Sequence, residues 1–357
     1  MAAAVSPAVR LLLLPGDGIG PEIAAATEAV LAAAATRHGL DLELARGTIG
    51  FAALERHGTT LPSAVVAAAL EADGVILGPV SHNAYPPADQ GGVNPSGMLR
   101  KALDLFANVR PARSIAGVPQ PIGSAVDLVV VRENLEGFYA DRNMFQGSGE
   151  FMPEPGIALA VRKITARGSR RIAERAFAIA AQRPASRVAA VHKANVLRVS
   201  DGLFLDEVRA VARQHNDIAY EEVIVDAATA LLVRDPGRFD VLVTTNMFGD
   251  ILSDLATELA GSLGLGASLN VGERHAMAQA QHGSAPDIAG KDVANPVSLI
   301  ASTAMLLRHL GHGGAADRID GACDRALADP STRTRDLGGA LGTEAFAAAV
   351  VADIRGD

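Results

Sequence analysis

Two aspartates spaced four residues apart are the clearest candidates for a metal site. Asp250 and Asp254 follow an apolar segment that ends at Thr245, and a helix beginning near Asp250 would point both carboxylates to one side. Carboxylate oxygens are the ligands that Mg²⁺ and Mn²⁺ prefer, and Asp226, at the end of the preceding predicted strand, could supply a third. The alternative is that the two acids only stabilise the positive end of the helix dipole.

Three arginines could bind the carboxylates of an acidic substrate. Arg110 precedes Pro111 at the end of an apolar segment, Arg132 ends a predicted strand, and Arg100 precedes both in the chain. Parallel α/β proteins bind ligands at the carboxyl ends of their strands, and guanidinium groups pair with carboxylates through two hydrogen bonds. Together the three would suit a di- or tricarboxylate, whereas each alone could be a solvated surface charge.

Lys193 and Tyr139 are candidates for proton transfer, because each follows a strand-like run. A lysine that is partly removed from water and near cations can act as a general base. The alternative for either residue is surface solvation or core packing.

Two glycine-containing segments raise the question of a nucleotide. In the loop 282–291, Asp287 could accept hydrogen bonds from a ribose diol and would repel a 2′-phosphate, which is how NAD sites differ from NADP sites. The segment 16–21 is not a dinucleotide fingerprint, because the third glycine of G-x-G-x-x-G would fall on Pro21. Its glycines still permit close backbone approach at a helix N-terminus, which suits an anion or a cofactor.

Alternating apolar strands and helices must position these residues. Strands are predicted at 9–14, 40–45, 74–77, 127–131, 187–192, 218–225 and 240–245. Helices are predicted at 21–38, 62–71, 169–181, 202–214, 250–261, 296–310 and 343–354. This alternation predicts an α/β fold with a mainly parallel sheet. The segment 141–157, rich in Gly, Pro and Met, has no clean periodicity and is predicted to be an arm.

The composition narrows the class of protein. The 357 residues carry a net charge of −8, with 4% aromatic residues and no Trp, which argues against a nucleic-acid partner. The single cysteine, Cys323, excludes an intramolecular disulfide and a multi-cysteine metal site. The apolar run at 9–14 is too short to span a membrane and does not indicate a secretory signal, so a cytoplasmic protein without a membrane partner is predicted.

Six motifs, in order, resemble the isocitrate/isopropylmalate dehydrogenase family of β-decarboxylating dehydrogenases. They are Leu14-Pro-Gly-Asp-Gly-Ile-Gly-Pro-Glu22, Asp104-Leu-Phe-Ala-Asn-Val-Arg-Pro111, Val131-Arg-Glu-Asn-Leu-Glu-Gly-Phe-Tyr139, His192-Lys-Ala-Asn-Val196, Asn246-Met-Phe-Gly-Asp-Ile-Leu-Ser-Asp254 and the loop 282–291. The resemblance implies a two-domain fold that is not a Rossmann fold. The large domain would comprise 1–105 and 261–357, on the cofactor side, and the small domain, 106–260, would carry a dimerisation arm.

The resemblance also implies roles for particular residues. The substrate would be bound by Asn94, Ser96, Arg100, Arg110 and Arg132. Mg²⁺ or Mn²⁺ would be bound by Asp226, Asp250 and Asp254. NAD would be bound by His282, Gly283, Ser284, Ala285, Asp287, Ile288 and Asn295.

The implied chemistry is oxidation followed by loss of CO₂. Lys193 would take the proton of the substrate hydroxyl while hydride passes to the nicotinamide, and Tyr139 would protonate the carbon that CO₂ leaves. Family members form homodimers with shared active sites, so Lys193 and Asp226 would serve the partner's site, and a tetramer remains open.

One departure from the family concerns the substrate. Where isopropylmalate-type members carry a Glu and two Leu before the first arginine, this chain has Val93, Ser96 and Gly97. Asn94 and Ser96 hold the polar pair of isocitrate-type members in exchanged order. Burial of an isopropyl group against Leu gains about 0.8 kcal/mol per CH₂, which Ser and Gly do not offer. We therefore expect isocitrate or homoisocitrate as substrate, with 3-isopropylmalate and tartrate or D-malate as alternatives.

A second departure is Gln279, where the family usually has Glu, so the charge beside the cofactor loop differs. A further alternative is a non-catalytic regulatory subunit, which should have lost part of the Lys, Tyr and Asp set. Lys193, Tyr139 and the three aspartates are all present, and an active enzyme is expected.

Overall fold

The computed structural model describes residues 8–139, 144 and 146–356. In this part of the chain ten strands form one sheet in the order β2-β1-β3-β12-β11-β4-β5-β10-β8-β9, and β6 pairs with β7 in a separate hairpin. The strand pairs toward both ends of the large sheet are parallel. The pairs β12–β11, β11–β4 and β4–β5 are antiparallel. The predicted α/β fold with a mainly parallel sheet is confirmed.

The bounds of the elements are as follows. The strands are β1 (Val9–Leu14), β2 (Leu42–Arg46), β3 (Gly74–Leu77), β4 (Ala107–Arg113), β5 (Asp127–Glu133), β6 (Glu150–Glu154), β7 (Ile157–Ala160), β8 (Arg187–His192), β9 (Ala219–Ile224), β10 (Val241–Thr244), β11 (Leu269–Val271) and β12 (Ala276–Gln279). The helices are α1 (Gly20–His38), α2 (Phe51–His57), α3 (Ser63–Glu71), α4 (Pro95–Ala102), α5 (Ala166–Ala180), α6 (Ser200–Ala212), α7 (Val225–Arg234), α8 (Asn246–Ala260), α9 (Val297–His309), α10 (Gly313–Ala328) and α11 (Thr343–Arg355).

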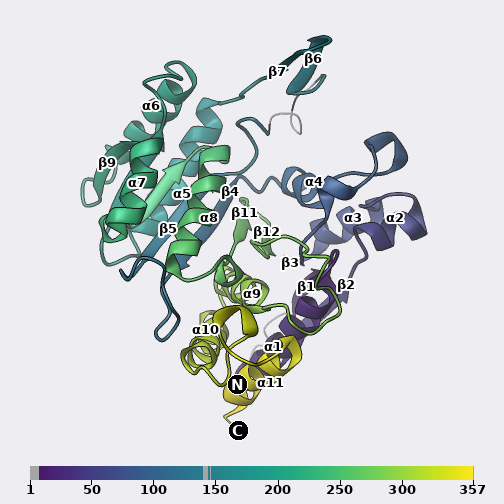
Figure 1. The fold of residues 1–357 in the computed structure, drawn as a ribbon. Coiled ribbons are helices and arrows are strands. Elements are labelled where there is room, and N and C mark those ends of the chain that lie inside the picture. The colour runs from purple at the N-terminus through teal and green to yellow at the C-terminus, as the bar shows by residue number, and fades with distance from the viewer. Residues whose placement is uncertain (1–7, 140–143, 145, 357) are drawn as a thin grey trace, which may run out of the picture.

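The sheet runs through two lobes (Figure 1). One lobe contains β1–β3 with α1–α4 and α9–α11, and here α1 near the start of the chain packs against α11 near its end. The other contains β5 and β8–β10 with α5–α8. The antiparallel pairing of β11 with β4 joins the lobes through backbone hydrogen bonds. The domain boundaries at 105/106 and 260/261 stay a prediction.

Local sequence explains the first elements directly. β1 lies between β2 and β3, and its alternate leucines belong to core clusters on opposite faces of the sheet. A strand covered on both faces needs the continuous apolar run that this segment has. α1 carries Pro21 in its first turn and ends before Gly39, whose φ of 62° is the left-handed conformation that favours glycine.

Other boundaries differ from the sequence expectations. β4 lies outside the predicted strands and β5 continues to Glu133, because the two pair antiparallel along their length and bury polar side chains inside the sheet. α8 begins at Asn246, four residues before its expected start. α2, α4, α7 and α10 also lie outside the predicted helices. α10 begins with two glycines, so its packing against α9 and α11, rather than local propensity, accounts for it.

The predicted arm, 141–157, includes β6, which forms the projecting hairpin with β7 (Figure 1). Its residues 141–143 and 145 lie outside the described residues. Among the helices of the described chain, none combines the length and the apolar character that a membrane span requires.

Candidate active site

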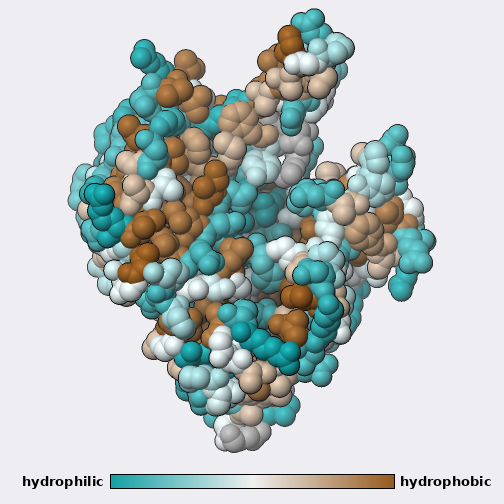
Figure 2. Space-filling model, in the orientation of Figure 1, coloured by the Kyte–Doolittle hydropathy of each residue, from teal (hydrophilic) through white to brown (hydrophobic). Residues whose placement is uncertain are grey.

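A cavity of about 240 Å³ lies where α4, α8, β4, β5 and the end of β12 converge. Figure 2 shows a largely hydrophilic recess between the two lobes. The predicted site residues that line the cavity are Asn94, Ser96, Arg100, Arg110, Arg132, Tyr139, Asp250, His282 and Gly283. The structure therefore brings most of the predicted substrate residues to one place, although they come from distant parts of the chain.

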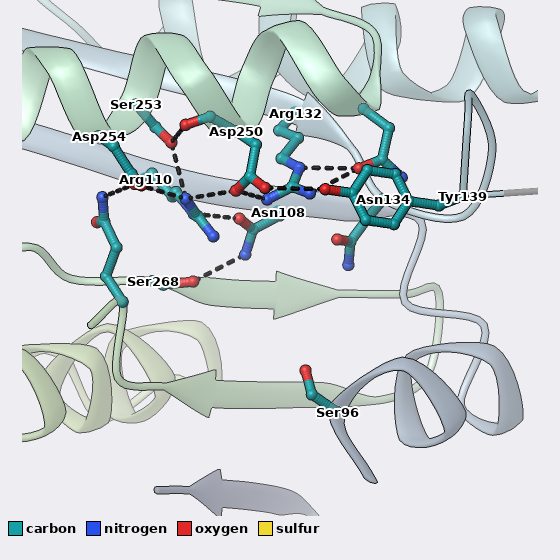
Figure 3. A network of polar contacts seen from close by, with 12 residues as sticks. Ser96, Asn108, Arg110, Arg132, Asn134, Tyr139, Asp250, Ser253, Asp254 and Ser268 are labelled. Atoms are coloured by element: carbon teal, nitrogen blue, oxygen red, sulfur yellow. Dashed lines mark hydrogen bonds and ion pairs between the residues drawn. The ribbon is translucent and has the colours of Figure 1, made fainter. Parts of the chain in front are cut away.

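Asp250 lies at the centre of a charged cluster in this cavity. Its Oδ1 accepts hydrogen bonds from Nη1 of Arg110, at 3.2 Å, and from Nη1 of Arg132. Its Oδ2 accepts from the hydroxyl of Tyr139 at 3.1 Å. The guanidinium of Arg132 lies 5.5 Å from the centre of the Tyr139 ring. Figure 3 shows the three side chains converging on Asp250.

Asp254 joins the cluster through Arg110. Nη1 of Arg110 donates to Asp254 Oδ1 at 3.2 Å and to Ser253 Oγ at 2.8 Å, and Gln281 Nε2 also donates to Asp254 Oδ1, at 2.9 Å. An acid stabilises the helix dipole when it lies in the first turn of a helix. Since α8 begins at Asn246, both aspartates lie beyond that turn. Arginine pairing explains their placement better than the dipole does.

Burial sets the charges of this cluster. Arg110 and Arg132 are only 6% and 2% exposed. Burial, followed by repulsion from Arg132, lowers the pKa of Arg110 to about 10, so this residue is still a cation at neutral pH. Burial alone would raise the pKa of Asp250, but Arg132 and then Arg110 outweigh burial and hold this pKa below its ordinary value. The cavity thus combines fixed cations with an ionised carboxylate.

Buried amides that the sequence analysis did not name hold the two arginines. Asn108 Oδ1 accepts from Nε of Arg110 at 2.6 Å. Asn246 Oδ1 accepts from Nε and Nη2 of Arg132 at 3.0 and 2.7 Å. Both asparagines are less than 2% exposed, and both lie in motifs that carry the family resemblance. Their functional importance could have been inferred from the sequence, because a polar residue at a buried position of a strand or helix needs a hydrogen-bond partner.

α4 presents polar groups to the cavity. Asn94 caps this helix through its Oδ1, which accepts from the backbone N–H of Gly97 at 3.1 Å, so its amide N–H groups remain for a ligand. Ser96 Oγ donates to Gln279 Oε1 at 3.1 Å, and Arg100 Nη2 donates to the same oxygen at 2.8 Å. This wall carries a hydroxyl, amides and a guanidinium, which are partners for substrate oxygens.

Lys193 and Asp226 lie together but do not line the cavity of their own chain. Lys193 Nζ forms an ion pair with Asp226 Oδ1, and the Asp226 side chain is 68% exposed. The hydrogen bond from Lys193 lowers the pKa of Asp226. Asp226 belongs to the first turn of α7 and not to the end of β9. Within one chain an acid faces Lys193, instead of the cations that the sequence analysis expected.

The described chain therefore supplies part of the predicted metal site. Asp250 and Asp254 lie together and offer the hard oxygen donors that suit Mg²⁺ or Mn²⁺. No group of three or more His, Cys, Asp or Glu within the described residues could hold a metal ion. The donors fit such a cation if the exposed carboxylate of Asp226 comes from a second copy.

The loop 282–291, which the sequence predicts to bind the cofactor, contains residues that face open space. His282 and Gly283 line the cavity. His282 Nε2 is buried without a hydrogen-bond partner among the described residues, and burial lowers the pKa of His282. A Cβ built on Gly283 would meet no atom within 4 Å, and Asp287 is exposed. The open space at Gly283 and the exposed side chain of Asp287 leave room for a ligand at this loop.

Other predicted cofactor residues hold the loop itself. Asn295 donates to Asp336 Oδ2 at 3.0 Å and accepts from a backbone N–H at 3.0 Å, so both ends of its amide are engaged. Ala285 and Ile288 pack against the main hydrophobic core. Their side chains shape the loop in this structure.

Asp17, which the sequence analysis did not include among the site residues, ties this loop to its neighbours. Its Oδ1 accepts from the backbone N–H of Phe51 at 2.8 Å. Its Oδ2 accepts from the backbone N–H of Ser81 at 2.9 Å and from the hydroxyl of Tyr85. Ser81 Oγ in turn lies 2.7 Å from Ser284 Oγ. A buried carboxylate therefore fixes the backbone beside the cofactor loop.

The glycines around Asp17 are explained by backbone contact. Gly18 has a φ of 57°, and a Cβ there would lie 1.9 Å from the carbonyl oxygen of Ser284. A Cβ on Gly16 would lie 2.1 Å from the carbonyl oxygen of Pro79. In this structure, the close approach that the sequence suggested is an approach to neighbouring protein loops.

The fold and site define a class of protein: the chain belongs to the isocitrate/isopropylmalate dehydrogenase family, whose sequence model matches residues 10–350. It is 42% identical over 348 residues to the isocitrate/homoisocitrate dehydrogenase of Thermus thermophilus, covering 96% of this chain and 98% of that protein. It is 40% identical over 338 residues to the 3-isopropylmalate dehydrogenase of Archaeoglobus fulgidus, covering 95% and 97%. A crystal structure of isocitrate dehydrogenase from Methylococcus capsulatus matches with a TM-score of 0.87 at 42% identity, covering 97% and 99%. The names span different substrates.

Proposed function

We propose that this chain is an NAD-dependent dehydrogenase, assisted by Mg²⁺ or Mn²⁺, that oxidises and decarboxylates a malate-type 2-hydroxy-3-carboxy acid, with isocitrate or homoisocitrate as its substrate. The observation that carries the proposal is the cavity in which Arg100, Arg110 and Arg132 surround Asp250 and Tyr139. Three guanidinium groups in one small cavity suit a molecule with several carboxylates.

The polar wall of the cavity, formed by Asn94, Ser96 and Gln279, supports isocitrate or homoisocitrate over the other candidate substrates. Asn94, Ser96 and Gln279 line the cavity where an isopropyl side chain would need apolar contacts. A carboxylate side chain can accept hydrogen bonds from the Asn94 amide and the Ser96 hydroxyl instead. We therefore rank isocitrate and homoisocitrate above 3-isopropylmalate, tartrate and D-malate.

The reaction assigns different work to different residues. Arg110 and Arg132 bind substrate carboxylates and hold them against the cluster around Asp250. Tyr139, whose hydroxyl already donates to Asp250 Oδ2, holds the proton that goes to the substrate carbon after CO₂ leaves. Lys193 of a second copy takes the proton of the substrate hydroxyl. A bound Mg²⁺ or Mn²⁺, held by Asp250 and Asp254 with Asp226 of a second copy, would supply Lewis acidity, and bound NAD would supply the hydride acceptor.

A homodimer is part of the proposal, because Lys193 does not line the cavity of its own chain. The β6–β7 hairpin projects from the molecule with Phe151, Ile157 and Leu159 each more than 40% exposed (Figure 1). Ile251 on α8, next to Asp250, is 54% exposed. Apolar surface beside an incomplete site is typical of an interface between copies of a chain.

The loop 282–295 supports NAD as the cofactor. The exposed carboxylate of Asp287 would accept hydrogen bonds from a ribose diol and repel the 2′-phosphate of NADP. Because Lys193, Tyr139, Asp226, Asp250 and Asp254 are all present, we favour an active enzyme over a regulatory subunit.

The test is a panel of acids assayed by reduction of the nicotinamide. Purified protein is incubated with isocitrate, homoisocitrate, 3-isopropylmalate, tartrate or D-malate, with NAD or NADP and with Mg²⁺ or Mn²⁺. The highest kcat/KM is expected for isocitrate or homoisocitrate with NAD. A highest value for 3-isopropylmalate would refute the argument from the polar wall, and a preference for NADP would refute the role of Asp287.

A further inference from the structure

The segment 193–201, the lysine loop, follows β8 and is held by a buried carboxylate. Asp201, in the first turn of α6, is completely buried, and its Oδ2 accepts a hydrogen bond from the backbone N–H of Lys193 at 2.6 Å. The carbonyl oxygen of Lys193 accepts from the backbone N–H of Leu197 at 2.8 Å, and that of Leu197 accepts from the N–H of Asp201 at 2.9 Å. The lysine loop is therefore a closed turn, and the side chain of its last residue fixes its first.

The second oxygen of Asp201 binds Arg162, which follows the β6–β7 hairpin. Nη1 of Arg162 donates to Asp201 Oδ1, and the Arg162 side chain is only 8% exposed. Nη2 of Arg162 donates to Thr245 Oγ1 at 2.9 Å, and its guanidinium lies 5.5 Å from the centre of the Phe248 ring. Because Thr245 directly precedes α8, the helix that carries Asp250, the ion pair connects the lysine loop to the cavity of the same chain.

Stability alone is a weak reason for a buried ion pair at this place. Removing two charges from water costs about as much as their attraction returns, so an apolar pair of similar size would serve the core equally well. A carboxylate does what an apolar side chain cannot, because one of its oxygens accepts from a backbone N–H while a cation holds the other. The backbone of Lys193 is thereby fixed at the point from which its side chain reaches Asp226.

We propose that Asp201 is a positioning residue for Lys193, and that Arg162 holds Asp201 in place. The inference rests on the proposed function, in which Lys193 takes the proton of the substrate hydroxyl in the cavity of a second copy. A general base must lie within hydrogen-bond distance of the proton it removes, and a displacement of about 1 Å can cost about 10²-fold in rate. Asp201 does not line the cavity, so it acts on turnover through the lysine.

The experiment compares Asp201→Asn with Asp240→Asn as a matched control. Asp240 has the same arrangement at the beginning of β8: it is 2% exposed, its Oδ1 accepts from Nε of Arg183, and its Oδ2 accepts from the backbone N–H of Arg187 at 3.1 Å. Both variants leave an arginine beside a neutral amide, but only Asp201 holds the lysine loop. The kcat and the KM values of the acid and of NAD are measured with Mn²⁺ and the best acid of the panel. Amide hydrogen exchange of the lysine loop is followed by mass spectrometry.

The expected result is a fall in kcat of about 10- to 100-fold in Asp201→Asn, with both KM values within about threefold of the wild type. Exchange in the lysine loop becomes faster. Asp240→Asn keeps kcat within about twofold and leaves exchange in the lysine loop unchanged. Arg162→Gln removes the other member of the ion pair and should lower kcat in the same way, which keeps the test valid if Asp201→Asn does not fold. An equal loss of kcat in Asp201→Asn and Asp240→Asn, or unchanged exchange in the lysine loop of Asp201→Asn, overturns the role of Asp201.

Heterodimers test whether Asp201 acts through the lysine of its own chain. Paired with Tyr139→Phe, Asp201→Asn leaves one cavity with an intact tyrosine and a correctly held lysine, so about half the wild-type kcat per dimer should return. Paired with Lys193→Met, it leaves both cavities without such a lysine, and no activity should return. Recovery in the second pair overturns the inference, as does no recovery in the first pair where Lys193→Met with Tyr139→Phe recovers. If the wild-type protein oxidises no acid of the panel, the proposed function fails, and hydrogen exchange alone decides whether Asp201 holds the lysine loop.

Discussion

Mixing two inactive variants tests whether the active site is shared between two chains. Tyr139 lines the cavity of its own chain, whereas Lys193 lies outside it, paired with Asp226. If Lys193 serves the cavity of the second copy, Lys193→Met and Tyr139→Phe damage different halves of each site. Each homodimer should lose turnover by about 10²–10⁴-fold, because each lacks one proton-transfer group, while substrate and metal should still bind.

A heterodimer of the two variants regains one complete site. The cavity of the Lys193→Met chain keeps its own Tyr139 and receives Lys193 from the other chain, whereas the second cavity lacks both groups. Heterodimers purified through two different affinity tags should therefore have about half the wild-type kcat per dimer, and an unsorted equal mixture about a quarter.

The assay is reduction of NAD with the best acid of the panel, after the tagged chains are co-expressed. The control is the heterodimer of Lys193→Met with Asp226→Asn, in which both damaged groups belong to the same half-site, so neither cavity is complete. A Lys193→Met/Tyr139→Phe heterodimer no more active than its parents, or a control that recovers equally, would show that the site is not shared in this way.

Three other predictions concern the supports of the site. Gly249→Ala would place a Cβ 2.6 Å from the Cβ of Arg132 and so displace this arginine. We expect the free energy of unfolding, measured by urea denaturation, to fall by about 1–3 kcal/mol and the KM of the acid, measured by steady-state kinetics, to rise at least about tenfold. An unchanged KM would refute this prediction. Asp17→Asn replaces the carboxylate that fixes the loop beside Ser284 with a neutral amide. We expect the free energy of unfolding to fall by about 1–3 kcal/mol and the KM of NAD to rise more than the KM of the acid. Equal rises in the two KM values would argue for a general structural role of Asp17. Burial raises the pKa of Glu133 to about 7 from its usual 4.5, so the folded protein holds this proton more tightly than the unfolded chain does. The resulting contribution to the free energy of unfolding, about 3 kcal/mol, is complete below pH 4.5 and is lost as the pH rises to 7. Glu133→Gln should therefore flatten the dependence of the free energy of unfolding on pH between these values, as measured by denaturation at a series of pH values.

Much of the fold could be predicted because it depends on local patterns. The strands β1, β3 and β8 have the predicted bounds, since each is a short apolar run ended by a turn or a polar residue. β4 could not be predicted in this way, because the polar side chains of Asn108 and Arg110 are buried where β4 pairs with β5 and β11. Likewise, the start of α8 could not be placed locally, because buried Asn246 belongs to its first turn and binds Arg132.

The residues that could carry the chemistry were determined by the sequence itself: their types, their order and the motifs around them indicate the family and its reaction. Only the tertiary structure decided which of them meet. It brought Arg110, Arg132, Tyr139 and Asp250 into one cluster and left Lys193 with Asp226 elsewhere. The reason is physical: spacing along a chain fixes neighbours within a helix or strand, whereas contacts between distant segments depend on how the sheet pairs and which polar groups must find partners when buried.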